Sequence, residues 1–243
     1  RTADSSSCWW SYSTLDRGVI QLIMKNILSV SILSANFEHL SRDIQDVEAA
    51  GADWIHIDVM DGRFVPNITM GPFIVEACRR ITNLPLDVHL MIEKPEDHIR
   101  SFASAGASII TVQQETCPHL HRTLEMIREE GCKTGIAYNP ATQVNNLHLV
   151  ANEVDMVLIM TVNPGYSGQS YIQGMEKKVE QVAKKIAEFE HPVRLQVDGG
   201  INLKTLPAVL KAGADTIVAA TAVFGHSDGA KAGVISLKQI LES

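Results

Sequence analysis

A histidine and an aspartate stand two positions apart within an apolar stretch of the sequence, as His56 and Asp58 in WIHIDVM at 54–60. Residues two apart in a β-strand point to the same face, so the two side chains are predicted to share one environment. Buried polar groups are costly without partners, which a metal ion, a hydrogen-bond network or a substrate would provide. This pair alone is a weak signal, and its interpretation depends on companions elsewhere in the chain.

Candidate companions occur in two further strand-like stretches. LDVHLM at 86–91 contains Asp87 and His89, and LQVDGG at 195–200 contains Gln196 and Asp198. Imidazole and carboxylate groups together suit Zn²⁺, Mn²⁺, Fe²⁺ or Co²⁺, and ligand type does not choose among these ions. If the strands end at one edge of the fold, the sequence predicts a site for a divalent metal there.

Small residues dominate the loops that follow the last three strand-like stretches. These loops contain NPGYSGQ at 163–169, then Gly199 and Gly200, then Ala220 and Thr221. Backbone N–H groups in such loops bind phosphate, particularly near a helix start. One glycine-rich loop would indicate only a tight turn. Three such loops after neighbouring strands predict a phosphate site.

Three methionines, Met60, Met91 and Met160, each close a strand-like stretch beside a candidate site residue. Methionine commonly fills gaps in cores. Around a metal site the three would form an apolar wall that lowers the local dielectric beside a developing anion.

The elements that must position these residues alternate regularly along the chain. Strand-like runs appear at 27–33, 54–59, 86–91, 108–112, 133–138, 156–161, 193–197 and 216–220. Helix-length amphipathic segments follow at 36–50, 72–81, 95–105, 118–130, 144–151, 174–189, 203–211 and 229–241. Eight such units predict an α/β protein folded as a closed (β/α)₈ TIM barrel, whose active site lies at the carboxyl ends of the strands. A doubly wound open sheet would also alternate, but no G-x-G-x-x-G follows the first strand.

Composition excludes several classes of protein. The 243 residues are 45% hydrophobic and 20% charged, as in ordinary globular domains. A net charge of −7 disfavours nucleic-acid binding, and no apolar run approaches the roughly 20 residues that span a bilayer. The four cysteines form no Cys-x-x-Cys pair, which favours reduced thiols in the cytoplasm.

Residues 1–23 do not match the pattern that follows. We expect them to be an N-terminal extension that is artificial, removed by processing or disordered, and 24–243 to be a single catalytic barrel domain. The alternative is a helix that covers the floor of the barrel.

Four segments closely resemble the motifs of the ribulose-phosphate 3-epimerase family: HIDVMDGRFVPNITMGP at 56–72, PLDVHLMI at 85–92, VNPGYSGQ at 162–169 and VDGGI at 197–201. The resemblance extends from about residue 27 to 241. It implies a ribulose-phosphate-binding barrel that interconverts D-ribulose 5-phosphate and D-xylulose 5-phosphate at C3 through an enediolate. Such an enzyme would serve the pentose phosphate pathway or Calvin-type metabolism in the cytoplasm and form a homo-oligomer.

The resemblance also implies roles for individual residues. One divalent ion, Zn²⁺ foremost, would be held by His56, Asp58, His89 and Asp198, and Asp58 and Asp198 would be the paired acid and base. Phosphorylated ketose would be contacted by Ser31, His56, His89, Met60, Met91, Met160, Gly165, Tyr166, Ser167, Gly168, Gly199, Gly200, Ala220 and Thr221.

Two departures from the family pattern stand near the expected site. Ala220-Thr221 replaces the usual Gly-Ser, which keeps a hydroxyl but adds methyl groups to the phosphate pocket. Gln113-Gln114-Glu115 replaces the usual His-x-Glu and changes one polar neighbour of the site. Two alternatives also fit the motifs, namely an allulose-6-phosphate 3-epimerase and a metal-binding phosphosugar sensor without turnover.

Overall fold

Eight parallel strands close into a barrel in the computed structural model, which describes residues 11–14, 20–23 and 25–243. The barrel strands are β3 (Ile27–Ser31), β4 (Trp54–Met60), β5 (Leu86–Met91), β6 (Ile109–Gln113), β7 (Lys133–Tyr138), β8 (Met156–Met160), β9 (Arg194–Asp198) and β10 (Thr216–Ala219). They follow one another in sequence order around the barrel, and pairing of β10 with β3 closes it. The predicted (β/α)₈ fold is confirmed.

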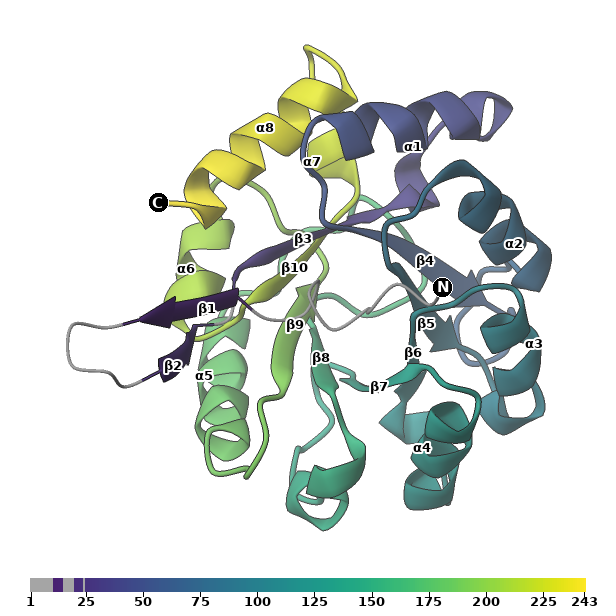
Figure 1. Cartoon of the computed structure of the whole chain (residues 1–243), viewed down its shortest axis with the longest axis vertical. Helices are drawn as coiled ribbons and strands as arrows, with labels where there is room; N and C mark the ends of the chain where they lie inside the picture. The colour runs from purple at the N-terminus through teal and green to yellow at the C-terminus, as the bar shows by residue number, and fades with distance from the viewer. Residues whose placement is uncertain (1–10, 15–19, 24) are drawn as a thin grey trace.

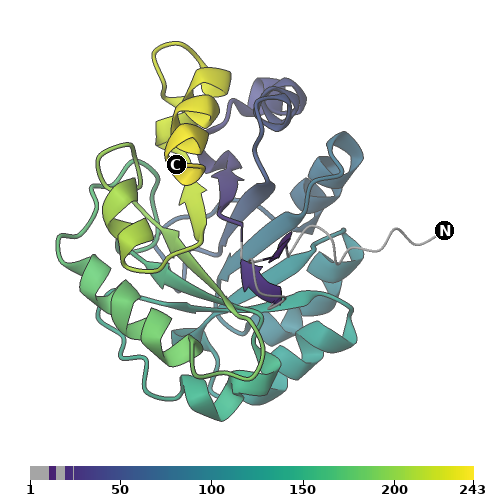
Figure 2. The same ribbon diagram turned by 60° about the vertical axis from the view of Figure 1, so that its left-hand side comes forward.

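Helices surround the strands (Figures 1 and 2). The α-helices are α1 (Leu40–Ala49), α2 (Pro72–Ile81), α3 (Ile99–Ser104), α4 (Leu120–Glu129), α5 (Met175–Ile186), α6 (Leu206–Lys211), α7 (Thr221–Phe224) and α8 (Ala230–Leu241). Short 3₁₀ helices are η2 (Ile32–Ser34), η3 (Phe37–His39), η4 (Pro95–Asp97), η5 (Gln114–Thr116) and η6 (Leu147–Glu153). Within the described residues, no helix is long and apolar enough to cross a membrane.

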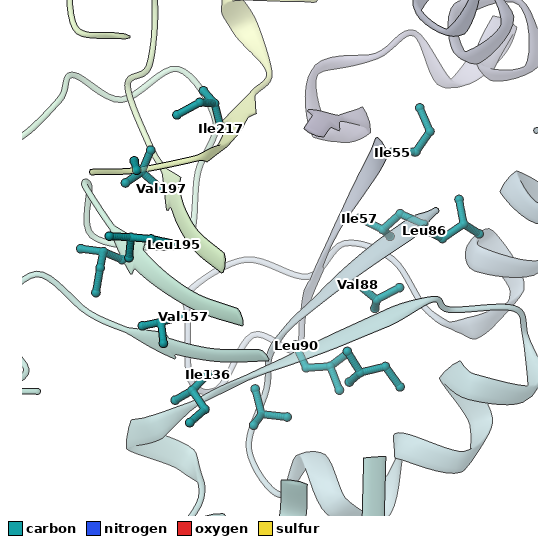
Figure 3. Packing of buried hydrophobic residues seen from close by; sticks show 14 of the residues in the cluster. Ile55, Ile57, Leu86, Val88, Leu90, Ile136, Val157, Leu195, Val197 and Ile217 are labelled. Carbon is teal, nitrogen blue, oxygen red and sulfur yellow. The ribbon is translucent and has the colours of Figure 1, made fainter. Parts of the chain in front are cut away.

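The alternation of side chains along the strands separates an apolar shell from a polar barrel interior. Outward-pointing residues such as Ile55, Ile57 and Val88 are fully buried against the helices, and Figure 3 shows such residues lying around the outside of the strands. Inside the barrel, Ile27, Trp54, Ile109 and Met156 form a small apolar cluster at the amino ends of their strands. Polar residues such as Ser29, His56 and Gln196 occupy the next interior positions on their strands, whereas β8 contributes the apolar Leu158.

Strand register brings the candidate site residues side by side. In the parallel pairing of β4 with β5, Asp58 stands opposite His89 and His56 opposite Asp87. In the pairing of β8 with β9, Met160 stands opposite Asp198. Because all the strands are parallel, their carboxyl ends meet at one mouth, where the sequence predicts the active site.

Two short antiparallel strands precede the barrel, β1 (Ser11–Thr14) and β2 (Ile20–Ile23), and form a separate two-stranded sheet. The sequence pattern did not predict them. Trp9 and Trp10, the large apolar residues of the expected extension, lie outside the described residues. The assignment of 1–23 as a segment apart from the catalytic domain therefore stays a prediction.

A chain that begins at Met24 is expected to keep the stability of the full chain. It retains Lys25 and Asn26, which contact the barrel through a hydrogen bond from Arg194 Nη1 to the Lys25 carbonyl and another from Asn26 Nδ2 to the Leu241 carbonyl. We expect the melting temperature to fall by less than about 3 °C, since about 1 kcal/mol shifts a protein of this size by 2–4 °C. A larger fall measured by calorimetry would show that residues 1–23 pack on the barrel.

Candidate active site

Four side chains of metal-ligand type meet inside the mouth of the barrel. His56 and Asp58 come from β4, His89 from β5 and Asp198 from β9, and one ligand atom of each lies within 4.8 Å of the others. The two histidines and Asp58 are buried. The structure therefore brings together the four residues that the sequence predicted as ligands.

The backbone of each aspartate is anchored by a threonine from an adjoining segment. Thr69 Oγ1 donates to the Asp58 carbonyl at 2.6 Å, and the Met60 N–H donates to Thr69 Oγ1 at 3.0 Å. Thr161 Oγ1 donates to the Asp198 carbonyl at 2.9 Å. Such anchors hold the two carboxylates on rigid strand ends, as precise chemistry requires.

Asp58 and His56 are tied into a dense set of polar contacts. Ser31 Oγ donates to Asp58 Oδ2 at 2.6 Å, and the other oxygen, Oδ1, lies 3.2 Å from His56 Nε2. The second ring nitrogen of His56, Nδ1, lies 2.7 Å from Asp87 Oδ2. Both ring nitrogens of His56 are therefore engaged. Nε2 faces Asp58 in the cluster, and Nδ1 faces Asp87 behind the cluster.

His89 presents an unsatisfied nitrogen to the cluster. Its Nε2 lies 3.0 Å from Gln113 Nε2, whereas its buried Nδ1 makes no hydrogen bond within the described chain. Nδ1 lies 3.5 Å from Asp58 Oδ1. A buried polar nitrogen without a partner is unusual and costly. A divalent cation beside two imidazoles and two carboxylates would satisfy it, so these residues fit the predicted metal.

The surroundings push the pKa values of the two aspartates in opposite directions. Burial raises the pKa of Asp198 to about 7, and the negative charge of Asp58 adds to the rise. Burial also acts to raise the pKa of Asp58, but the charge and hydrogen bond of His56, together with the nearby His89 imidazole, outweigh it and hold that pKa below its usual range. Carboxyl groups whose pKa values are pushed apart are typical of acid and base pairs.

The two histidines also differ in pKa. Burial alone would lower the pKa of His56, but the charges of Asp87 and Asp58 outweigh it and raise the pKa well above 6.5. Burial lowers the pKa of His89, and the nearby negative charge of Asp58 offsets this only in part. Neutral imidazole, the form that binds metal, is therefore favoured at His89 even without an ion.

A cavity opens above the cluster and collects nearly all the predicted substrate-contacting residues. Asp58, Asp198 and Ser31 line its inner end, and Met60, Met91 and Met160 form part of its wall. The predicted phosphate loops complete the lining with Gly165, Tyr166, Ser167, Gly168, Gly199, Gly200, Ala220 and Thr221. His56 and His89 are not among the lining residues, so their contact with substrate stays a prediction.

Close packing explains the two consecutive glycines after β9. Gly199 has φ +118°, and a Cβ there would lie 2.4 Å from a Val162 methyl carbon. A Cβ on Gly200, at φ +67°, would lie 2.3 Å from the Tyr171 backbone nitrogen. Only glycine fits at these positions, where the segment after β8 lies directly against the end of β9. The cavity wall is therefore continuous between these two predicted phosphate loops.

The loop after β8 also reaches across the mouth to the loop after β3. Ser167 Oγ lies 2.5 Å from Ser34 Oγ, and a Cβ on Gly165 would lie 3.1 Å from Pro66 Cδ in the segment after β4. The loop at 163–169 therefore forms part of the cavity wall and contacts the segments after β3 and β4.

The structure shows what the two departures from the family pattern do locally. Thr221 begins α7, and its methyl carbon Cγ2 lies 3.6 Å from where a Cβ on Gly168 would stand, so the methyl group narrows the cavity at this point. Gln113 stands where the family pattern has a histidine, and its amide lies 3.0 Å from His89 Nε2.

Sequence reasoning missed several residues of the site. It did not identify the cavity-lining residues Leu33, Val162, Ile201 and Val218. It also assigned no role to Ser29, Asp87 or Gln196, although Ser29 and Gln196 both donate hydrogen bonds to Asp87 below the cluster. Their position two residues before Ser31, His89 and Asp198 was the available signal, because such residues face the same barrel interior.

Comparison with known proteins shows which family this chain matches. Residues 27–224 match the model of the "Ribulose-phosphate 3 epimerase family". Ribulose-phosphate 3-epimerase of Bacillus subtilis is 53% identical over 203 residues, which cover 83% of this chain and 94% of the relative. The chloroplastic ribulose-5-phosphate-3-epimerase of Arabidopsis thaliana is 50% identical over 208 residues, covering 85% of this chain and 74% of the relative.

Solved structures with similar folds are more distant in sequence. The 3-hexulose-6-phosphate synthase of Salmonella typhimurium superposes with a TM-score of 0.66 at 16% identity, covering 89% of this chain and 98% of that chain. Thiamine phosphate pyrophosphorylase from Pyrococcus furiosus gives a TM-score of 0.61 at 15% identity, covering 89% and 95%. At such identities the likeness concerns the barrel fold alone.

Proposed function

The chain belongs to the ribulose-phosphate 3-epimerase family and is an epimerase, and from this premise we propose that it interconverts D-ribulose 5-phosphate and D-xylulose 5-phosphate in a metal-dependent reaction. The observation that carries the proposal is the position of two carboxylates, Asp58 and Asp198, in one cluster with two histidines below a cavity rimmed by small-residue loops. That arrangement combines a proton donor and acceptor with a place for a phosphate.

Epimerisation at C3 removes a proton from one face of the carbon and returns one to the other. Asp58 and Asp198 come from β4 and β9, which are separated in the barrel by β3 and β10, so they reach the cavity from different sides. We assign one as the base and the other as the acid in each direction. The hydrogen bond from Ser31 to Asp58 orients the Asp58 carboxylate beside the substrate.

His56, Asp58, His89 and Asp198 would hold the ion, for which we propose Zn²⁺. When bound, a divalent cation supplies positive charge that stabilises the oxygens of an enediolate. The methionines at 60, 91 and 160 keep water from this part of the cavity and lower its dielectric. The loops containing Gly165–Gly168, Gly199–Gly200 and Ala220–Thr221 would bind the phosphate and orient the sugar.

A coupled assay on purified protein tests the substrate. We expect kcat/KM for D-ribulose 5-phosphate to exceed that for D-allulose 6-phosphate, with activity dependent on bound zinc. The identity to ribulose-phosphate 3-epimerases supports the pentulose phosphate. A preference for the hexulose phosphate would reassign the substrate, and metal and sugar binding without turnover would indicate a sensor instead.

We also propose that the protein forms a homo-oligomer, lies in the cytoplasm and acts in pentose phosphate metabolism. Phe37 and Phe73 are 47% and 70% exposed and flank one groove with Leu33, Met70 and Ile74. Exposed apolar patches of this kind often mark interfaces. Phe73→Ser is expected to dissociate the oligomer in sedimentation measurements, whereas Leu149→Ser, at a residue that is 69% exposed elsewhere, is expected not to. A monomeric unmodified protein would contradict the oligomer.

The cytoplasmic location is supported by three buried free cysteines, Cys78, Cys117 and Cys132. Cell fractionation tests it, and recovery of the protein from another compartment would contradict it.

A further inference from the structure

A second set of buried polar side chains lies behind the ligand cluster. This network consists of four fully buried residues: Ser29, Asp87, Gln113 and Gln196. None belongs to the cluster of four ligand candidates, and none lines the cavity. Asp87 and Gln113 contact the two histidines of the cluster, and Ser29 and Gln196 contact Asp87.

Asp87 is the centre of this network and contacts His56. Its Oδ2 accepts hydrogen bonds from Ser29 Oγ at 3.0 Å and Gln196 Nε2 at 2.6 Å, and lies 2.7 Å from His56 Nδ1. An ionised carboxylate only accepts hydrogen bonds, so the proton in the contact must come from Nδ1. That arrangement leaves the Nε2 lone pair of a neutral His56 facing the cluster.

Gln113 holds the other histidine by the opposite nitrogen. The Gln113 amide lies against His89 Nε2 at 3.0 Å, and Nδ1 is the nitrogen directed at Asp58. An amide carries a donor on one side and an acceptor on the other. A half-turn of the amide places Oε1 opposite Nε2, where it can accept the Nε2 proton. His89 Nδ1 then keeps its lone pair for the cluster.

We propose that Asp87 and Gln113 are positioning residues that hold His56 and His89 in opposite tautomers, so that His56 offers Nε2 and His89 offers Nδ1 to a single ion. The inference deepens the proposed metal centre and rests on it. It explains why a carboxylate and two amides, and not apolar side chains, fill this layer of the barrel. Buried polar groups are costly, and here they hold the histidines that bind the metal.

Substitutions at these positions separate tautomer control from packing. In Asp87→Asn, the new amide group can donate to His56 Nδ1 and thereby favour the tautomer that protonates Nε2. Gln113→Leu removes the acceptor beside His89, whereas Gln113→Glu retains one. Thr111→Val is the matched control, because Thr111 is fully buried on the same strand as Gln113 and its hydroxyl has no hydrogen-bond partner within the described chain.

Zinc affinity of the full chain, measured by competition with a chelator, provides one readout. Loss of such a partner weakens metal binding by about 10–100-fold. We expect that loss in Asp87→Asn and Gln113→Leu, and affinity close to that of the unmodified protein in Gln113→Glu and Thr111→Val. The second readout is the ¹⁵N spectrum of histidine rings in the zinc-loaded protein. It should show one ligand protonated at Nδ1 and the other at Nε2.

Three results would overturn the proposal. Unchanged zinc affinity and ring signals in both Asp87→Asn and Gln113→Leu would do so while leaving the metal centre intact. Two zinc-bound histidines in the same tautomer would also contradict it. Failure of the unmodified protein to bind zinc would remove the metal centre itself, and the positioning role with it. If Asp87→Asn does not fold, the comparison of Gln113→Leu with Gln113→Glu decides alone.

Discussion

Asp198→Asn is expected to reduce kcat for epimerisation of D-ribulose 5-phosphate by about 10²–10⁴-fold, the range that general acid–base groups contribute. The asparagine amide has nearly the same shape but neither takes up nor releases a proton at C3. Asp198 lines the cavity and lies in the cluster with Asp58, so its carboxylate can exchange a proton with a substrate bound there. Steady-state kinetics on the purified variant measure the loss.

Two controls accompany this variant. Zinc content must be determined, because Asp198 is also a proposed ligand and its replacement could act by losing the ion. Asp61→Asn alters a carboxylate just beyond β4 that accepts hydrogen bonds from the backbone N–H groups of Arg63 and Phe64 and does not line the cavity. We expect that change to leave kcat within about 10-fold of the unmodified enzyme, which is less than a lost acid or base costs. A zinc-loaded Asp198→Asn enzyme with normal turnover would contradict the assigned role.

His89→Ala is expected to lose bound metal and activity together while the barrel remains folded. The imidazole is fully buried, and its Nδ1 is the unsatisfied nitrogen of the cluster, so its removal takes away one ligand of the proposed four. Metal analysis after exchange into chelator-free buffer, with circular dichroism as a check on folding, measures the outcome. His121→Ala serves as the control, because His121 has a 57% exposed side chain paired with Glu125 on α4.

Full zinc occupancy in His89→Ala would remove His89 from the ligand set. Loss of activity with the metal retained would assign His89 to substrate contact instead. Loss of metal from the control variant as well would show that the loss in His89→Ala is not specific to the barrel mouth.

The barrel could be predicted from the sequence because alternation of side chains is a direct consequence of strand geometry. His56 and Asp58 share a face with Trp54 and Met60, and parallel pairing brings that face into the barrel interior. The same reasoning grouped His89 and Asp198 with them. It could not tell that Asp87 contacts His56 and Gln196 one layer deeper, because periodicity gives the face of a residue and not its partners.

Helix ends and short helices were less predictable. The segment predicted as a helix over 203–211 forms α6 only from Leu206, because Asn202 and Thr205 first make a turn and Pro207 belongs in a first helical turn. The helix predicted over 95–105 is divided into η4 and α3 at His98. The segment 144–151 forms a 3₁₀ helix over Leu147–Glu153. At 203–211, side-chain contacts within the turn compete with an amphipathic pattern.

Isotope labelling during a single conversion in heavy water tests the two-carboxylate reaction most directly. With Asp58 and Asp198 acting from different sides, the proton taken by one is not the proton delivered by the other. D-xylulose 5-phosphate formed early from D-ribulose 5-phosphate should then carry solvent deuterium at C3, while substrate recovered at the same time remains largely unlabelled. Substantial transfer of the substrate hydrogen to C3 of the product would instead show that one base serves both faces, and would leave the second aspartate no role in proton transfer.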